Sequence, residues 1–166
     1  VRQRLIFALD VDNFEDARTW VQRLSGKVGV FKIGKQLFTR CGPDVVRMVN
    51  ERGGDVFLDL KYHDIPNTVA SAGLEALKLG VRMFNVHALG GPEMMQALVA
   101  AVDTAAPRET PGRPLLLAVT ILTSAGDETL RAIGIDRPVA EMVPRLARLA
   151  KAAGMDGVVA SPQEVG

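Results

Sequence analysis

The 166-residue sequence has little of several features that mark particular classes of protein. Its single cysteine, Cys41, excludes an internal disulfide and a multi-cysteine metal site, and it is typical of a reducing cytoplasm. The 20 basic residues nearly balance the 19 acidic ones and aromatic residues make up only 5%, so no nucleic-acid surface is indicated. No apolar run approaches the roughly 18 residues of a membrane span, and the N-terminus lacks a secretory h-region. We therefore expect a cytoplasmic protein that binds neither nucleic acid nor membrane.

Hydrophobic residues make up 48% of the sequence and charged residues 23%, which is typical of a globular chain with one core. We expect residues 1–166 to form a single domain. Six apolar runs of strand length alternate with stretches in which apolar residues recur at helical spacing. This alternation predicts a parallel sheet with right-handed crossover connections. The predicted strands begin near residues 5, 28, 56, 81, 115 and 157.

Capping residues, prolines and glycines set the limits of the predicted helices. Asp12 or Asn13 is expected to cap the first helix, which ends at Gly26, and Pro43 is expected to open the second. Further helices are predicted over 67–79, from Pro92 onward, over 139–153 and from Pro162, and none between Gly34 and Pro43 or between Ser124 and Val139.

Two architectures fit such a parallel sheet, an open doubly wound sheet and a closed (β/α)8 barrel. The open sheet commonly has a glycine-rich turn after its first strand, but the segment here is ALDVDN. A barrel carries polar active-site residues at the carboxyl ends of its strands. The ends of the predicted strands favour the α/β class with a (β/α)8 TIM barrel, because they carry Asp10, Lys32, Asp59, Lys61, His87 and Thr123.

A barrel of eight strands typically needs about 250 residues, whereas this sequence has 166 and six predicted strands. We therefore expect a barrel truncated after strand six, without the last two βα units. The loops after strands seven and eight commonly bind phosphate in such barrels. Residues with that role are expected beyond Gly166.

The segment DLKYHDIPNT, residues 59–68, follows the apolar run of the third predicted strand. Side chains in a strand alternate between its two faces, so Asp59 and Lys61 are expected on one side, with Asp64 adding a second acid nearby. Two acids around one lysine are costly if they are even partly buried. On the pattern D-x-K-x-x-D alone, a solvated salt bridge at a strand end remains the alternative.

The same segment resembles the active-site motif of the orotidine 5'-phosphate decarboxylase family, including its continuation I-P-N-T. Five other segments resemble that family in the same order along the chain, namely LIFALD, VFKIGKQLF, FNVHALGGPEMM, AVTILTS and DGVVASPQE. The resemblance implies an enzyme that converts orotidine monophosphate to uridine monophosphate and CO2 in pyrimidine biosynthesis. Because the sequence contains no cofactor motif, we expect neither a metal nor an organic cofactor.

Loss of CO2 from C6 of the pyrimidine leaves a carbanion in the plane of the ring, which the ring π system cannot delocalise. The resemblance implies that Lys61 stabilises this charge and then protonates C6. Asp59 is expected beside the substrate carboxylate, where its charge disfavours the ground state. Lys32 and Asp64 are expected to complete an alternating array in which every charge has opposite neighbours and Lys61 stays charged.

The resemblance also implies substrate contacts outside this array. Asp10 is expected at the ribose hydroxyls, Thr68 at the ribose or phosphate, and Thr123 at the pyrimidine edge. The plainer alternatives are a strand-end cap for Asp10, a helix N-cap for Thr68 and an ST-turn for Thr123. Asp64, Ile65 and Thr68 are implied to reach the neighbouring subunit's site across a two-fold interface, which predicts a homodimer with shared sites.

Two other functions stay open at this point. A metal-dependent phosphosugar lyase of the same barrel suprafamily shares the D-x-K-x-x-D core but not the I-P-N-T continuation. A non-catalytic fragment would keep this half of the site without turnover. The residues from Ile65 to Thr68 argue against the lyase.

Overall fold

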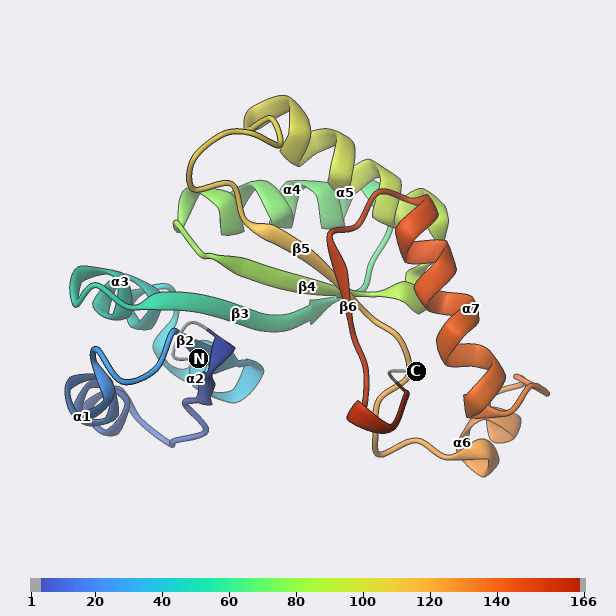
Figure 1. The fold of residues 1–166 in the computed structure, drawn as a ribbon, viewed down its shortest axis with the longest axis horizontal. Helices are drawn as coiled ribbons and strands as arrows, with labels where there is room; N and C mark the ends of the chain where they lie inside the picture. The colour runs from blue at the N-terminus through green and yellow to red at the C-terminus, as the bar shows by residue number, and fades with distance from the viewer. Residues whose placement is uncertain (1–3, 165–166) are drawn as a thin grey trace.

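The computed structural model describes residues 4–164, and its centre is one parallel sheet of six strands. The strands lie side by side in the order in which they occur in the sequence. In an open doubly wound sheet the strand order reverses, whereas in a barrel it does not. The sheet is curved (Figure 1), so the prediction of barrel architecture is confirmed. The strands are β1 (Ile6–Ala8), β2 (Val30–Gly34), β3 (Asp55–Tyr62), β4 (Met83–His87), β5 (Leu115–Val119) and β6 (Gly157–Val159).

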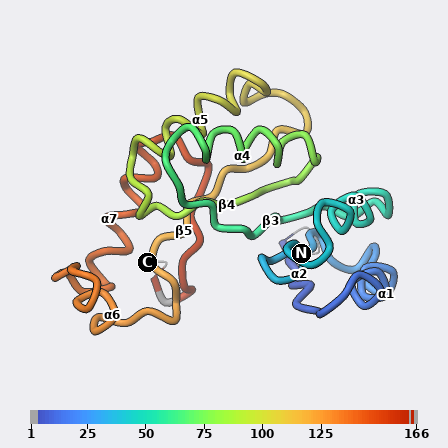
Figure 2. The backbone as a smooth tube through the Cα atoms, turned by 180° about the vertical axis from the view of Figure 1, so that it is seen from behind, coloured from blue at the N-terminus to red at the C-terminus, as the bar shows by residue number. Residues whose placement is uncertain are grey.

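Helices connect consecutive strands, and α4, α5 and α7 lie outside the curve formed by β4 to β6 (Figure 1). Seen from behind in Figure 2, α1 and α3 lie at one end of the molecule and α6 and α7 at the other. The helices are α1 (Phe14–Leu24), α2 (Lys35–Cys41), α3 (Asp44–Glu51), α4 (Pro66–Lys78), α5 (Pro92–Ala105), α6 (Asp127–Ala132) and α7 (Val139–Ala152), with the short 3-10 helices η2 (Ala88–Gly90) and η3 (Pro162–Glu164).

Five helices lie where the sequence predicts them, and local capping explains how two of them begin. The side chain of Asn13 accepts a hydrogen bond of 2.9 Å from the backbone N–H of Asp16 at the start of α1. Pro66 occupies the first turn of α4, where its missing N–H is not needed. None of the described helices is long and apolar enough to span a membrane.

Helices α2 and α6 lie in segments for which the sequence predicts no helix. Both are short, of seven and six residues, and each follows a glycine that offers no side-chain cap. Leu37 is the only residue of α2 that is fully buried, and Leu130 the only one of α6. Because one buried residue makes no helical periodicity, neither segment carries a recognisable helix pattern.

Helices α4 and α5 pack closely because α4 has a glycine where they meet. A Cβ atom at Gly73 would lie 2.2 Å from Leu98 Cδ1 and 3.3 Å from Phe84 Cζ. Both neighbours are fully buried in the hydrophobic core. A glycine within a helix costs up to about 1 kcal/mol relative to alanine, so its use here indicates that close approach matters. This packing holds α4 against α5, and α4 follows directly after the loop that carries Asp64.

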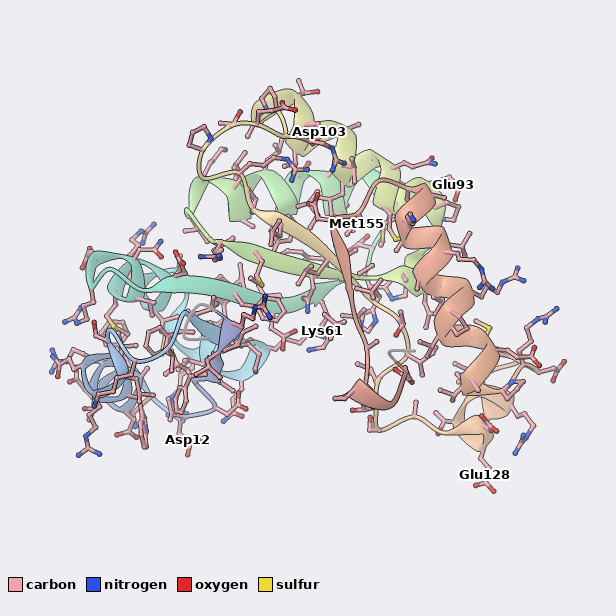
Figure 3. The ribbon with its side chains drawn as sticks, in the orientation of Figure 1. Asp12, Lys61, Glu93, Asp103, Glu128 and Met155 are labelled. Carbon is pink, nitrogen blue, oxygen red and sulfur yellow. The ribbon has the colours of Figure 1, made fainter. Side chains whose placement is uncertain are left out.

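A network of charged side chains holds the sheet at the amino-terminal ends of β5 and β6. The guanidinium of Arg113, only 5% exposed, donates hydrogen bonds to Asp103 at 2.8 Å and to Asp156 at 3.0 Å. Asp156 also accepts the backbone N–H of Leu116 at 2.8 Å. Burial opposes the charge of Arg113, but its hydrogen bonds to the two aspartates outweigh that effect and raise its pKa. In Figure 3 Asp103 lies well away from Lys61.

We expect Arg113→Met to destabilise the fold without changing catalysis. Removing one partner from a buried ion pair leaves the other charge without compensation, which costs about 3 kcal/mol. Urea unfolding measures this loss, and kcat of the folded variant should stay unchanged. Arg47→Met is the matched control, because the ion pair of Arg47 with Asp44 is exposed and its loss should cost under about 0.5 kcal/mol. Equal losses in the two variants would contradict a special role for the Arg113 network.

Candidate active site

The ends of the first three strands bring four charged residues together. Asp10 follows β1, Lys32 lies in β2, and Asp59 and Lys61 lie near the end of β3. The strand register pairs Ala8 with Lys32 and continues across β2 to β3, so these carboxyl ends meet at one edge of the sheet. The expectation that polar strand ends converge is met by these four residues.

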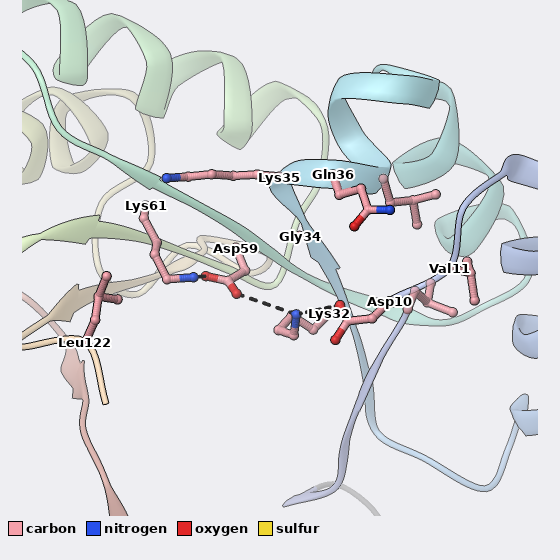
Figure 4. A pocket seen from close by; sticks show the side chains of 11 residues that line it. Asp10, Val11, Lys32, Gly34, Lys35, Gln36, Asp59, Lys61 and Leu122 are labelled. Atoms are coloured by element: carbon pink, nitrogen blue, oxygen red, sulfur yellow. Dashed lines mark hydrogen bonds and ion pairs between the residues drawn. The ribbon is translucent and has the colours of Figure 1, made fainter. Parts of the chain in front are cut away.

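The four side chains form a chain of alternating charge, which we call the charge cluster and which Figure 4 shows. Lys61 Nζ lies 2.6 Å from Asp59 Oδ1, and Lys32 Nζ lies 3.6 Å from Asp59 Oδ2. Lys32 Nζ also donates a hydrogen bond of 3.1 Å to Asp10 Oδ1. An alternating array is therefore present within one chain, but Asp10 extends it at the Lys32 end, and Asp64, which the sequence predicts beside Lys61, is not part of it.

Asp59 is the centre of the charge cluster and its most enclosed member, with a side chain only 12% exposed. Burial alone would raise its pKa. Hydrogen bonds from Lys61 and Asn85, together with the charges of Lys61 and Lys32, outweigh burial and lower the pKa of Asp59 below its ordinary value of 3.8. The Asp59 carboxylate is consequently ionised at neutral pH.

The charge cluster lines an open pocket of about 380 Å³ at the carboxyl edge of the sheet. This volume falls in the range of pockets that bind small molecules, roughly 300–1,000 Å³. Besides the cluster, the pocket is lined by Leu9, Val11, Gly34, Lys35, Gln36, Leu37 and Leu122. Gln36 and Leu37 belong to α2, so the helix that the sequence does not predict forms part of the pocket wall.

The end of β3 departs from regular strand geometry. Its register with β4 shifts between Leu58 and Tyr62, and Lys61 has a φ of 50°. Among the described residues Lys61 is the only non-glycine residue with positive φ. Lys61 and Asp59 nevertheless share the pocket, and Leu60 packs against the core, as strand alternation predicts.

Asn85 is a site residue that the sequence analysis does not single out. It is fully buried in β4, where its side chain hydrogen-bonds to both Asp59 and the backbone of Lys61. Its signal in the sequence is a lone amide within the apolar strand MFNVH. A buried amide must be hydrogen-bonded, so its presence there points to polar partners on a neighbouring strand.

Asp64, Ile65 and Thr68 are exposed and do not line the pocket of their own chain. Asp64 Oδ1 accepts the backbone N–H of Ile65 at 2.7 Å. Within the described part of this chain, Asp64 forms no ion pair with Lys32 or Lys61. Thr123 is also exposed and follows Leu122, which does line the pocket.

His87 and His63 lie beside the site, with ring centroids 5.5 Å apart. Burial lowers the pKa of His87, repulsion from its neighbours His63, Lys35 and Lys61 lowers it further, and Asp59 partly opposes this. Neither ring lines the pocket. No group of three or more histidine, cysteine or acidic residues between 4 and 164 is arranged to hold a metal ion.

Comparison with known proteins identifies the family. The family model described as "Orotidine 5'-phosphate decarboxylase / HUMPS family" matches residues 3–166. An orotidine 5'-phosphate decarboxylase of Syntrophotalea carbinolica is 69% identical over 99% of this chain and 68% of its own length. The enzyme of the same name from Geobacter sulfurreducens is 60% identical, again over 99% of this chain and 68% of its own length.

A solved structure agrees with these sequences. The crystal structure of orotidine 5'-phosphate decarboxylase from Lactobacillus acidophilus matches with a TM-score of 0.88 and 41% identity, over 97% of this chain and 72% of that one. This chain has six parallel strands in sequence order and a charge cluster at the carboxyl ends of the first three, and it resembles these enzymes along its whole length. The chain belongs to the orotidine 5'-phosphate decarboxylase family.

Proposed function

We propose that this chain decarboxylates orotidine 5'-phosphate to uridine 5'-phosphate and CO2, a step of pyrimidine biosynthesis. The observation that carries the proposal is Lys61 Nζ, held 2.6 Å from the ionised Asp59 at the pocket that joins β1, β2 and β3. The relatives named orotidine 5'-phosphate decarboxylase support it, because they match 99% of the chain.

In the proposed reaction the bond between C6 and the carboxylate carbon breaks, and its electron pair stays on C6 while CO2 leaves. The ammonium of Lys61 stabilises this developing charge and then transfers a proton to C6. Solvent later returns a proton to Lys61. The contact with Asp59 holds the Lys61 ammonium in place before substrate arrives.

Asp59 has a second proposed effect, on the substrate itself. Its carboxylate would face the carboxylate of the bound nucleotide, and two like charges at short distance raise the energy of the ground state. The repulsion falls when CO2 leaves and the negative charge moves to C6, next to Lys61. Lys32, 3.6 Å from Asp59 Oδ2, keeps the Asp59 carboxylate in place.

Substrate binding is proposed for residues around the pocket rim. The Asp10 side chain is 71% exposed, so it can accept hydrogen bonds from ribose hydroxyls while it holds Lys32. Thr123 lies in the loop after β5 and is proposed to contact the pyrimidine edge. Thr68 stays proposed for the ribose or phosphate, and the main phosphate contacts are proposed for loops after strands seven and eight.

We further propose a cytoplasmic homodimer with shared sites. Ile65 is 66% exposed although it is a large apolar residue, and it adjoins the exposed Asp64 and Thr68 at the start of α4. Because none of the three lines the pocket of its own chain, all three are available to contact a partner. In a two-fold dimer each chain would place these three residues at the pocket of its partner.

The activity is tested by following the absorbance of orotidine 5'-phosphate in the presence of purified protein and a chelator. We expect turnover at the same rate before and after dialysis against the chelator. The lysine and carboxylate groups of the site supply both the proton donor and the charges that stabilise the carbanion. A large loss that a divalent cation restores would favour the metal-dependent lyase. No turnover by this chain, but turnover by a version extended to the length of its relatives, would identify a non-catalytic fragment.

A further inference from the structure

Asn85 joins the two central residues of the charge cluster through one side chain. Its Nδ2 donates a hydrogen bond of 2.7 Å to Asp59 Oδ1. Its Oδ1 accepts the backbone N–H of Lys61 at 2.8 Å. The residue is 0% exposed and does not line the pocket, so it contacts Asp59 and Lys61 on the side away from the pocket.

The irregular end of β3 is what requires such a partner. Leu58 pairs with Phe84, but the next pair is Tyr62 with Val86, so β3 has two more residues than β4 in this interval. The extra length takes Lys61 out of the regular ladder of backbone hydrogen bonds. Its partly buried N–H donates instead to Asn85 Oδ1, and without that acceptor it would be an unsatisfied donor, which is unfavourable.

The backbone of Lys61 is strained in a way that suits this arrangement. A φ of 50° is unfavourable for a residue with a Cβ atom. Such conformations persist when surrounding contacts determine them, and they concentrate at functional sites. The hydrogen bond from Lys61 N–H to Asn85 is a contact of that kind, and it sets the direction in which the lysine side chain leaves the backbone.

The same amide also orients the carboxylate. Asp59 Oδ1 accepts hydrogen bonds from Lys61 Nζ and from Asn85 Nδ2, at 2.6 and 2.7 Å. With Oδ1 held by two donors, Oδ2 is turned toward Lys32. The Asn85 amide therefore fixes both the rotation of the Asp59 carboxylate and the backbone conformation of Lys61.

We propose that Asn85 is a positioning residue, which sets the geometry between the Asp59 carboxylate and Lys61 without touching substrate. The inference rests on the proposed decarboxylase function. A residue with this role acts on the transition state more than on substrate binding, because a misplacement of about 1 Å can cost on the order of 100-fold in rate. Asn85→Leu should therefore lower kcat about 100-fold and change KM less than about 3-fold.

A second variant, Asn85→Asp, distinguishes positioning from packing. It keeps the acceptor for Lys61 N–H, but the introduced carboxyl can donate to Asp59 only when it is protonated. Asp59 and Lys61 face it from β3, His87 lies two residues away on its own strand, and Leu117 lies opposite on β5. Burial and the charge of Asp59 raise the pKa of the introduced carboxyl, so kcat should fall as pH rises through that pKa. The wild type should lack this step.

The matched control is Thr120→Val, because Thr120 is also fully buried and its hydroxyl donates to the Val159 carbonyl, away from the charge cluster. We expect its kcat within about 2-fold of wild type. An equal loss of kcat in Thr120→Val, or a loss in Asn85→Asp that does not change with pH, would overturn the proposal.

A crystal structure of Asn85→Leu separates this inference from the function on which it rests. If positioning holds, Lys61 should leave its positive φ or Asp59 should rotate, whatever reaction the protein catalyses. Unchanged geometry at both residues would overturn the proposal even if kcat fell. An inactive wild type would instead overturn the proposed function and leave this structural result standing.

Discussion

Lys61→Ala is expected to lower kcat by about 10⁴-fold or more, because the substitution removes both the proton donor and the charge that stabilises the carbanion. The fold should survive, since the Lys61 side chain lines a pocket and is not a member of the hydrophobic core. A continuous assay of orotidine 5'-phosphate measures the rate, and urea unfolding measures stability. Lys78→Ala is the control, because Lys78 is an exposed lysine on α4 whose ion pair with Glu75 lies outside the charge cluster.

The variant Lys61→Arg tests whether Lys61 is the proton donor or contributes only a positive charge. Arginine keeps the positive charge but effectively never releases its proton, and its planar group is too large to occupy the place of an ammonium. We expect this variant to fail nearly as badly as Lys61→Ala. If it kept most of the rate, Lys61 would contribute a charge but could not be the acid that protonates C6.

A mixture of two inactive variants, Lys61→Ala and Asp64→Ala, should recover activity if sites are shared between subunits. In a mixed dimer one site would lack both residues and the other would be complete. Random exchange makes about half of the dimers mixed, so activity should return to about a quarter of the wild-type value. The exposed position of Asp64, outside the pocket of its own chain, is the reason to expect this result.

The control mixture pairs Lys61→Ala with Asp59→Ala. Lys61 and Asp59 contact each other within one chain, so every site of a mixed dimer would lack one of them and no activity should return. Mass spectrometry must first show that subunits have exchanged. An absence of recovery with Asp64→Ala after confirmed exchange would mean that Asp64 serves its own chain.

The sheet could be predicted from the sequence because each strand is an apolar run and each run ends in a polar residue. That pattern also brought Asp10, Lys32, Asp59 and Lys61 to one edge, since carboxyl ends of parallel strands necessarily meet there. Their pairwise contacts did not follow from the pattern. Strand order alone does not determine whether Asp64 lies beside Lys61, because that depends on how the loop after β3 turns.

The parts that could not be predicted depend on contacts between segments distant in the sequence. Helix α2 has one fully buried residue and no capping side chain, so its conformation is set by the neighbouring helix and sheet rather than by its own periodicity. The positive φ of Lys61 likewise depends on Asn85, which lies 24 residues further along the chain. The lone asparagine in an apolar strand indicates a buried residue that needs hydrogen-bond partners, but the sequence does not show which residues those partners are.

The alternation of charge at the site has a consequence for how nucleotides arrive there. Two cations and two anions lie within a few ångströms of one another, so their charges sum to zero. The potential of such a group decays with distance faster than that of a single ion, and salt screens the remainder. The net charge of the whole chain is only +1. The field of these four residues therefore acts on an anionic nucleotide at contact and adds little to long-range attraction.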